Sequence, residues 1–286
     1  MPSDTGEHAD MTGETGALDL DLARPPRDLV AVDGPAATGR DRVQRSDSLR
    51  LRTEFSRKIA EMRESRMLTP AELNEKRLIY PEMPNREAAN AFREIRRKVM
   101  QFHGPGNFVT MVTSVISGGG ASVVALNLAA AFAFDETKTA VVIDCNLENP
   151  RLADLLGMKP DKGLTDYLED DTLDIADIIY PTGIPRLRLV PAGRRREASA
   201  EYFSSIRMEE FVASLKNRYP DRYLVLDAPP IGESVDANML SDLVDCALIV
   251  APYGGTTEEQ ITSAAFSIGK EKLAGLVFNE EPRIVL

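Results

Sequence analysis

Short apolar runs alternate with helical patterns from residue 106 onward, and this alternation narrows the possible folds more than any other feature. The apolar runs are continuous and rich in β-branched residues, which is typical of strands buried on both faces of a sheet. Strands that alternate with helices favour right-handed crossovers and parallel pairing. We therefore predict an α/β fold for residues 106–286, with a mostly parallel sheet and helices on both faces. The expected strands lie at 108–115, 140–145, 187–193, 222–228, 246–252 and 273–279, and the expected helices at 122–134, 150–156, 208–219, 236–245 and 257–270.

The start of the chain has a different composition. Residues 1–50 are rich in Gly, Pro, Asp, Thr and Ser and show no sustained apolar period. Such a segment cannot bury enough apolar surface to offset its chain entropy. We expect a disordered, initially acidic N-terminal tail that serves as a charged linker or as a short partner-binding segment.

Residues 51–105 have the composition of a helical segment. Thr69, Pro70 and Glu72 have the order of an N-cap, a first-turn proline and an N3 acid, which predicts a helix start. A second helix is expected over 86–102, and its apolar face consists of Ala88, Phe92, Ile95 and Val99. We expect this segment to pack on the α/β domain or to lead into it.

Composition and charge exclude several classes of function. The net charge of −11 argues against a general nucleic-acid binder, whose surface would be basic. No apolar run approaches the roughly 20 residues of a membrane span, and the N-terminus has no apolar signal-peptide core. Cys145 and Cys246 lie in apolar runs, as buried reduced thiols do, which fits a cytoplasmic protein. His8 and His103 are the two histidines, so a Ser-His-Asp triad or a histidine zinc site lacks its parts.

The stretch SVISGGGASVVALNLAAAF, residues 114–132, has the layout of a strand end, a glycine-rich turn and a helix start. Glycines 118–120 would allow successive backbone N–H groups to face an anion, and the following helix adds the positive end of its dipole. Ser122 has the position of a hydroxyl that binds Mg²⁺ in a phosphate loop. The stretch therefore predicts a phosphate site, with a purely structural glycine turn as the alternative.

Two other expected strands end in aspartates, Asp144 and Asp227. The carboxyl ends of parallel strands are where such sheets bind ligands, and Asp227 has the position of a carboxylate that organises a metal. Ser122 and Asp227 are the candidate Mg²⁺ ligands, although both aspartates could instead cap helices. The full candidate set for binding a nucleotide is Gly118, Gly119, Gly120, Ala121, Ser122, Asp144 and Asp227.

The order of these motifs resembles the bacterial tyrosine kinases, cytosolic P-loop proteins of the MinD/ParA-like class that work with membrane copolymerases in exopolysaccharide synthesis. VTSVISGGGASVVALNLAAAFA is similar to the family's first strand, phosphate loop and helix. VVIDCNLENPRL and RYLVLDAPPIGESVDANMLSDLVDCALIV are similar to its two aspartate-bearing segments, and LAGLVFN is similar to its closing strand. The resemblance implies a P-loop NTPase-like fold, ATP or ADP with Mg²⁺ as ligand, and ATP-dependent protein-tyrosine phosphorylation with Asp144 and Asp227 at the catalytic positions.

Several residues depart from the family pattern around the phosphate site. Ala121 stands where the family has the loop lysine, and Ile116 stands where MinD-like proteins have theirs. Asn146 replaces an aspartate, and Glu148 stands at a position that is commonly arginine. The last tyrosine is Tyr253, whereas family kinases end in a tyrosine cluster. These departures predict a pseudokinase-like protein with weak or no nucleotide turnover.

The resemblance also implies an interface and a partner. Family members pack into rings through a Glu-x-x-Arg-x-x-Arg helix, which here reads Asn90-x-x-Arg93-x-x-Arg96. Arg93 and Arg96 are therefore the expected contacts if a homo-oligomer forms. The expected partner is the cytoplasmic part of a membrane polysaccharide copolymerase, a chain-length regulator that would recruit this cytoplasmic chain to the inner membrane face.

Three functions stay open at this point. The first is a cytosolic pseudokinase-like regulator or scaffold in exopolysaccharide or capsule biosynthesis and export. The second is an unconventional ATPase or protein-tyrosine autokinase of the same family, and the third is a MinD/ParA-like positioning ATPase. The basic run 194–196 is interpreted as a solvated loop, with contact to an acidic partner or a lipid headgroup as its alternative.

Overall fold

The computed structural model describes residues 62, 64, 66–196, 200–218 and 221–279. The expectations for residues 1–50 lie outside this part of the chain. So does the beginning of the expected helical segment, up to residue 61.

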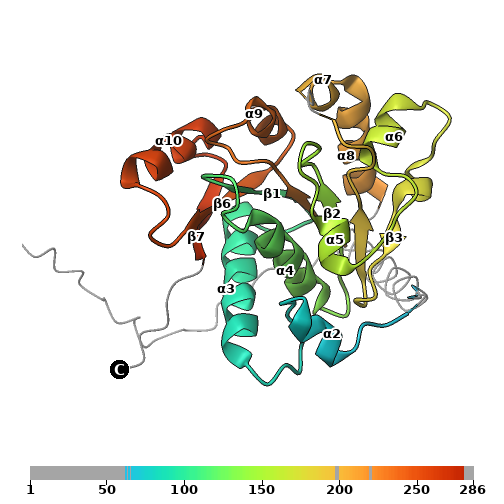
Figure 1. Ribbon diagram of the computed structural model, residues 1–286, viewed down its shortest axis with the longest axis horizontal. Helices are drawn as coiled ribbons and strands as arrows, with labels where there is room; N and C mark the ends of the chain where they lie inside the picture. Colours follow the sequence, from blue (N-terminus) through green and yellow to red (C-terminus); the bar gives the residue numbers. More distant parts are fainter. Residues whose placement is uncertain (1–61, 63, 65, 197–199, 219–220, 280–286) are drawn as a thin grey trace, which may run out of the picture. The chain divides into compact units, whose positions relative to one another are not determined.

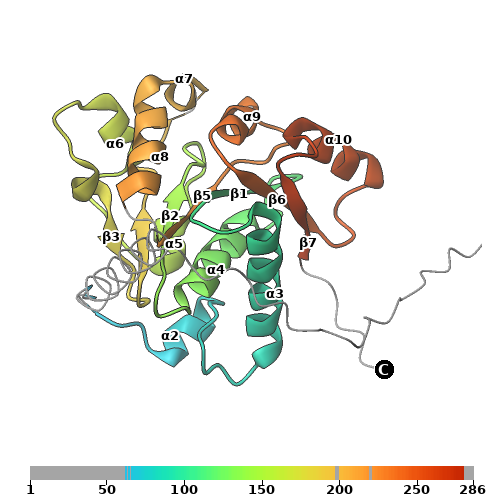
Figure 2. The same ribbon diagram turned by 180° about the vertical axis from the view of Figure 1, so that it is seen from behind.

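The described residues form a seven-stranded sheet with the order β3-β4-β2-β5-β1-β6-β7. Figure 2 shows β2, β5, β1, β6 and β7 following one another across it. All neighbouring strands pair in parallel except β3 and β4, which are antiparallel. The strands are β1 (Val109–Ser114), β2 (Thr139–Asp144), β3 (Tyr180–Pro181), β4 (Leu187–Val190), β5 (Arg222–Asp227), β6 (Cys246–Pro252) and β7 (Leu273–Asn279). The predicted mostly parallel sheet is confirmed, and β3 is an addition that the apolar pattern did not predict.

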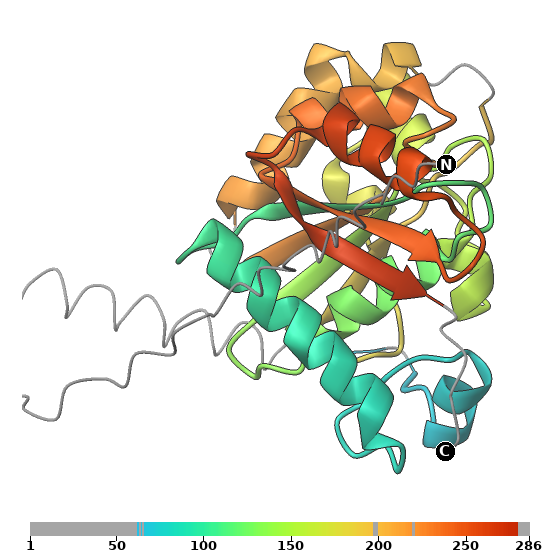
Figure 3. The same cartoon turned by 90° about the vertical axis from the view of Figure 1, so that its left-hand side faces the viewer.

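Helices cover both faces of the sheet, as predicted, and Figure 3 shows the two layers on either side of the strands. One layer contains α2 (Pro70–Glu75), α3 (Arg86–His103), α4 (Ala121–Ala133) and α5 (Leu152–Leu156). The other contains α6 (Leu164–Glu169), α7 (Ala200–Phe203), α8 (Ile206–Arg218), α9 (Val235–Asp242) and α10 (Glu258–Ile268), with the short 3₁₀ turn η1 (Ile175–Ile178).

Strand β2 explains why the apolar runs are continuous. Ala140 and Val142 face the core under α4, whereas Val141 and Ile143 face the core on the opposite side of the sheet. Successive side chains of a strand point to opposite faces, so a strand covered on both faces needs apolar residues at every position.

One expected strand is shorter than predicted. The run 187–193 ends its pairing at Val190, before Pro191. Proline has no N–H to donate to a sheet ladder. The carbonyl oxygens of Pro191 and Ala192 instead accept hydrogen bonds from the first N–H groups of α6, those of Leu164 at 2.8 Å and Thr165 at 2.9 Å. The chain thereby leaves β4 and supports the start of α6.

Helix α4 runs directly under the sheet and is buried along most of its length (Figure 1). Its alanines allow the backbone to approach the strands closely. Asn127 is the polar exception: its Oδ1 accepts from the N–H of Ile79 at 2.8 Å, and its Nδ2 donates to the carbonyl oxygen of Arg77 at 3.1 Å. The side chain thus attaches the segment after α2 to the buried face of α4.

Helices α2 and α3 form where the sequence predicts them. Thr69 and Glu72 make the expected capping box at the start of α2. The predicted apolar face of α3 packs against the core of its layer, and Val99 is fully buried there. On the same helix, the guanidinium of Arg96 donates to the carbonyl oxygen of Ala131 at 2.7 Å, and that of Arg93 lies 5.3 Å from the ring centre of Phe134. These contacts join α3 to the end of α4, and the subunit-interface role of the two arginines stays a prediction.

Cys145 and Cys246 are free and buried, and burial raises the pKa of both thiols. Among the helices of the described residues, none combines the length and the apolar character that a membrane crossing requires.

Candidate nucleotide site

The sheet order brings the candidate loop and both aspartates to one edge. Strand β5 lies between β2 and β1. Asp227, at the end of β5, is in register with Asp144 on β2 and with Val112 on β1. The glycine-rich loop follows β1 directly and leads into α4. The structure therefore places Ser122, Asp144 and Asp227 at the carboxyl edge of three adjacent strands, where ligands of such sheets bind.

The loop conformation depends on glycine at specific positions. Gly120 has φ +89°, in the left-handed region, and a Cβ there would lie 2.1 Å from Nδ2 of Asn279. At Gly119 a Cβ would lie 2.9 Å from Cβ of Ser114. Side chains at these positions would therefore collide with neighbours or strain the backbone, so the glycines have a steric reason that is independent of any ligand.

Helix α4 begins without a side-chain cap, because its N-cap is Gly120. The first helical residue is Ala121, which is 7% exposed. The helix N-terminus provides N–H groups and the positive end of its dipole. Position 121 provides no cation, and the partly buried Ile116 packs against apolar core residues.

Asp227 is fully buried, and neither of its carboxylate oxygens has a hydrogen-bond partner among the described residues. Burial raises its pKa well above the usual range, and the negative charge of Asp144 raises it further. The nearby Ser122 hydroxyl acts in the opposite direction and lowers the pKa. A buried carboxyl group without a partner costs free energy unless it is neutral or binds a cation.

Asp144 has a different environment, although it stands next to Asp227. Its Oδ2 accepts from the backbone N–H groups of Arg151 at 3.0 Å and Leu152 at 2.9 Å, at the start of α5. Burial raises its pKa to about 6, despite these N–H donors and that of Asn146. The helix-capping alternative from the sequence therefore describes Asp144, while Asp227 caps no helix in this way.

Two residues that the sequence did not single out contact the loop. Nδ2 of Asn279, the last residue of β7, donates to the carbonyl oxygen of Gly119 at 3.1 Å. The carboxylate of Glu233 accepts from the N–H of Ser117 at 3.3 Å and from its hydroxyl at 2.8 Å. Both contacts link residues more than a hundred positions apart, and no local pattern predicts them.

The arrangement fits the metal-binding side of a magnesium–nucleotide site better than the phosphate-binding side. The Ser122 hydroxyl and the unpartnered Asp227 carboxylate are oxygen groups of the kind that Mg²⁺ prefers. Within the described residues, no cluster of three or more His, Cys, Asp and Glu side chains could hold a metal by itself. A bound Mg²⁺ would therefore share its coordination with phosphate oxygens and water. On the phosphate side, the loop offers N–H groups but no lysine at 116 or 121.

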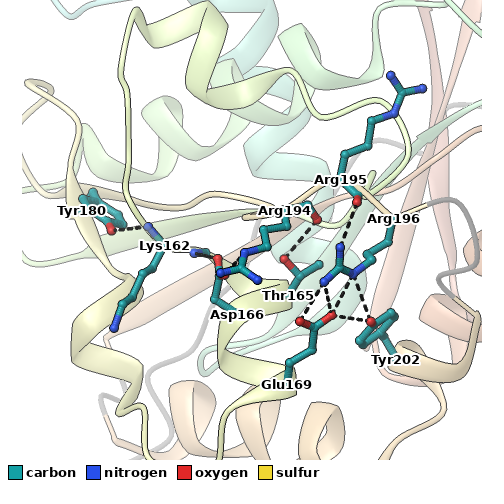
Figure 4. Close-up of polar contacts among 10 residues, drawn as sticks. Lys162, Thr165, Asp166, Glu169, Tyr180, Arg194, Arg195, Arg196 and Tyr202 are labelled. Carbon is teal, nitrogen blue, oxygen red and sulfur yellow. Dashed lines mark hydrogen bonds and ion pairs between the residues drawn. The ribbon is translucent and has the colours of Figure 1, made fainter.

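The basic run 194–196 lies beside the segment that follows Asp144, and Figure 4 shows its contacts. Arg196 donates from Nε to Glu169 at 2.7 Å and to the Tyr202 hydroxyl at 3.2 Å. Its backbone N–H donates to the carbonyl oxygen of Leu147 at 3.0 Å. Arg194 pairs with Asp166 at 3.2 Å. Arg194 and Arg195 are exposed in a loop, as the solvated-loop interpretation predicts, whereas the partly exposed Arg196 also anchors this turn to α6, α7 and the segment after β2.

Comparison of the sequence with known proteins finds relatives that include tyrosine-protein kinases and a polysaccharide transport protein. No protein-family model matches the chain. It is 29% identical over 192 residues to the tyrosine-protein kinase CpsD of Streptococcus agalactiae, a match that covers 66% of this chain and 81% of CpsD. It is 30% identical over 175 residues to the tyrosine-protein kinase Wzc of Salmonella typhi, covering 60% of this chain and 24% of Wzc. The succinoglycan biosynthesis transport protein ExoP of Rhizobium meliloti is 26% identical over 213 residues, or 71% of this chain and 26% of ExoP.

Solved structures show the same fold. The chimeric protein CapA2B2 superposes with a TM-score of 0.66 at 22% identity, covering 77% of this chain and 94% of the other. The VpsO kinase domain has a TM-score of 0.61 at 25% identity, with 74% and 97% covered. The cell division ATPase MinD of Pyrococcus furiosus has a TM-score of 0.52 at 23% identity, with 62% and 73% covered. By sequence and by fold, the homologues of this chain are the bacterial tyrosine kinases, on a P-loop NTPase fold of the MinD type.

Proposed function

We propose that this chain is a pseudokinase-like regulator or scaffold in exopolysaccharide or capsule biosynthesis and export, with weak or no nucleotide turnover. The observation that carries the proposal is Ala121, an almost buried methyl group at the first position of α4. The tyrosine kinases that it resembles have a lysine there.

The chemistry of phosphoryl transfer supports this proposal. Such enzymes work mainly by positioning and by neutralising charge on the transferred phosphate. Removing one preorganised donor of that kind typically lowers the rate by about 10²–10³. Here the loop lacks its lysine and carries the Glu233 carboxylate at Ser117. Both features reduce the attraction of the loop for a triphosphate.

Retained nucleotide binding is compatible with the proposal. The N–H groups at the start of α4 would face the phosphates, and Ser122 with Asp227 would hold a Mg²⁺ ion. When bound, that ion would neutralise phosphate charge and allow Asp227 to ionise. ATP or ADP is therefore the proposed ligand, used for conformational control and not for efficient catalysis.

The names of the relatives suggest the biological process in which the chain acts, its location and its partner. CpsD and Wzc are named as tyrosine-protein kinases, and ExoP as a succinoglycan biosynthesis transport protein. We propose the cytoplasm as location and the cytoplasmic segments of a membrane polysaccharide copolymerase as partner. Deletion of the gene should reduce exopolysaccharide or surface adhesion, and an unchanged phenotype would count against this role.

Calorimetry with ATP and ADP in the presence of Mg²⁺ tests the proposed state of the site. Wild type should bind weakly or not at all, and Ala121→Lys should bind more tightly. Ala121→Met is the matched control, because it adds a long side chain without charge. Tight binding together with steady turnover by the wild type would contradict the proposal.

The second function is an unconventional ATPase or protein-tyrosine autokinase. The unpartnered Asp227 carboxylate beside Ser122 favours it, because these are the groups that would organise Mg²⁺. Incubation with radiolabelled ATP and Mg²⁺ should then label the protein, and Asp227→Asn should abolish labelling.

A MinD/ParA-like positioning role ranks third, because Ile116 packs against the apolar core at the position of the MinD lysine.

A further inference from the structure

The phosphate loop already binds an anionic group that belongs to the protein itself. Ser117 donates to the Glu233 carboxylate from its backbone N–H, at 3.3 Å to each oxygen, and from its hydroxyl at 2.8 Å. Ser117 stands directly before the glycines of the loop. Glu233 comes from the connection between β5 and α9. The fold therefore brings an acid to the first residues of the loop.

The backbone that carries Glu233 is held against the strand that leads into the loop. The N–H of Ile231 donates to the carbonyl oxygen of Ser114 at 3.0 Å, and that of Glu233 donates to the carbonyl oxygen of Pro230 at 3.1 Å. At Gly232 a Cβ would lie 2.5 Å from the carbonyl oxygen of Val115. Any side chain at 232 would push the two backbones apart, so glycine permits the close approach.

The next turn of the chain holds this connection from the other side. Ser234 accepts from the N–H of Asp236 at 3.2 Å and caps α9. Glu233 is thus placed between a backbone contact to β1 and the fixed start of a helix. The backbone of the 230–234 turn therefore places the Glu233 carboxylate next to Ser117.

We propose that Glu233 is an internal ligand of the phosphate loop and decides which anions the loop accepts. Its carboxylate occupies donors of Ser117 and adds a negative charge beside the loop. A phosphate group must displace it or bind against it, and like charges at such distances repel each other. The inference rests on the proposed function, since it treats the loop as an anion site that the chain restrains.

Calorimetry on the full chain tests the inference, with pyrophosphate and with ADP plus Mg²⁺ as probes. Glu233→Gln keeps the shape of the side chain and removes its charge. It should bind both probes at least about tenfold more tightly than wild type, as expected for the removal of one like-charge contact. Glu136→Gln is the control, because it makes the same change in net charge in the turn before β2, at the opposite edge of the sheet.

The same comparison in the Ala121→Lys background covers the case in which the wild-type loop binds too weakly to measure. Equal affinities with and without Glu233→Gln in both backgrounds would overturn the inference, and so would a lack of binding by both proteins that carry this substitution. An amide NMR spectrum adds a readout without ligand: the Ser117 resonance should move in Glu233→Gln and stay in place in Glu136→Gln. A Ser117 resonance that does not respond would also overturn it.

Failure of this inference and failure of the proposed function give different results. Turnover of ATP by wild type would reject the pseudokinase proposal, while the effect of Glu233 on affinity could still be measured. A wild type without turnover, combined with no effect of Glu233→Gln, would reject the internal ligand alone.

Discussion

Arg96 on α3 donates from its guanidinium to the carbonyl oxygen of Ala131, near the end of α4, at 2.7 Å. The same carbonyl oxygen accepts only a long hydrogen bond from the chain, from the N–H of Phe134 at 3.4 Å, and a cation at the end of a helix complements the helix dipole. Arg96 therefore caps the helix that begins directly after the glycine-rich loop. Its sequence neighbour Arg97 pairs with Glu94 on the exposed side of α3.

This contrast predicts different effects for two adjacent arginines. Arg96→Met should lower the free energy of unfolding by about 1–2 kcal/mol, because a charge-assisted hydrogen bond to α4 is lost. Arg97→Met should leave the melting temperature near that of wild type, because exposed ion pairs contribute little. Urea unfolding of both variants measures the difference, and equal losses would show that Arg96 does not stabilise α4.

Two glycines with positive φ, Gly120 in the glycine-rich loop and Gly254 elsewhere, provide a second matched pair of variants. Gly120→Ala should destabilise the protein by strain at φ +89° and by collision with Asn279, whereas Gly254→Ala meets only the strain of φ +67°, because no atom lies within 4 Å of its added Cβ. Strain alone costs about 1–2 kcal/mol, so Gly120→Ala should cost more than Gly254→Ala. Thermal unfolding checks this order. Adding Asn279→Ala should recover part of the loss at 120 and none at 254.

The hydrogen bonds of Asn127 should make a large contribution to the free energy of unfolding, because they attach the segment after α2 to α4. Asn127→Ala leaves the N–H of Ile79 and the carbonyl group of Arg77 without this partner, and should cost about 2–4 kcal/mol for the buried groups concerned. Asn74→Ala removes an exposed amide that donates to Tyr80 and serves as the milder control. Similar unfolding midpoints for the two variants would contradict the assigned role of Asn127.

The two buried aspartates predict how stability depends on pH. Their pKa values are higher in the folded protein than the ordinary 3.8, with Asp144 at about 6 and Asp227 raised well above the ordinary value. The folded state therefore binds protons more tightly than the unfolded state. The stability that these protons contribute is present at low pH and is lost as pH rises from about 4 to 6 and beyond.

Asp227→Asn tests this pH dependence, because it removes the buried charge. The variant should be more stable than wild type at pH 8, by about 1–2 kcal/mol. The difference should shrink as the pH falls, because protonation of Asp227 then removes the buried charge from wild type. Melting temperatures across the pH range measure the effect, with the exposed Asp242→Asn as the control. A constant difference at every pH would contradict ionisation as its cause.

Mg²⁺ should stabilise the folded protein by compensating the buried charge of Asp227, which by itself lowers stability at high pH. A cation that binds the folded state alone raises its stability, so millimolar Mg²⁺ should raise the melting temperature of wild type at pH 8. Asp227→Asn should not respond. A shift of the same size in both proteins would place the ion elsewhere.

Local features of the sequence predicted most of the elements. Continuous apolar runs predicted the longer parallel strands, because burial on both faces requires apolar residues at every position. Thr69, Pro70 and Glu72 predicted the start of α2 from capping chemistry that lies within one turn. The two residues of β3 carry too little pattern for any such prediction, and Pro191 shortened the strand expected at 187–193.

The sequence by itself therefore determined the alternation of strands and helices, the glycine loop, the absence of a lysine at position 121 and the family to which the motifs point. Only the tertiary structure decided that Asp144 caps α5 while Asp227 has no partner among the described residues, that Asn279 contacts Gly119, and that Glu233 reaches Ser117. The physical reason is that elements form through contacts within a few residues, whereas the site forms where β1, β2 and β5 become neighbours. Strand order and register set those contacts, and no short stretch of the sequence determines either of them.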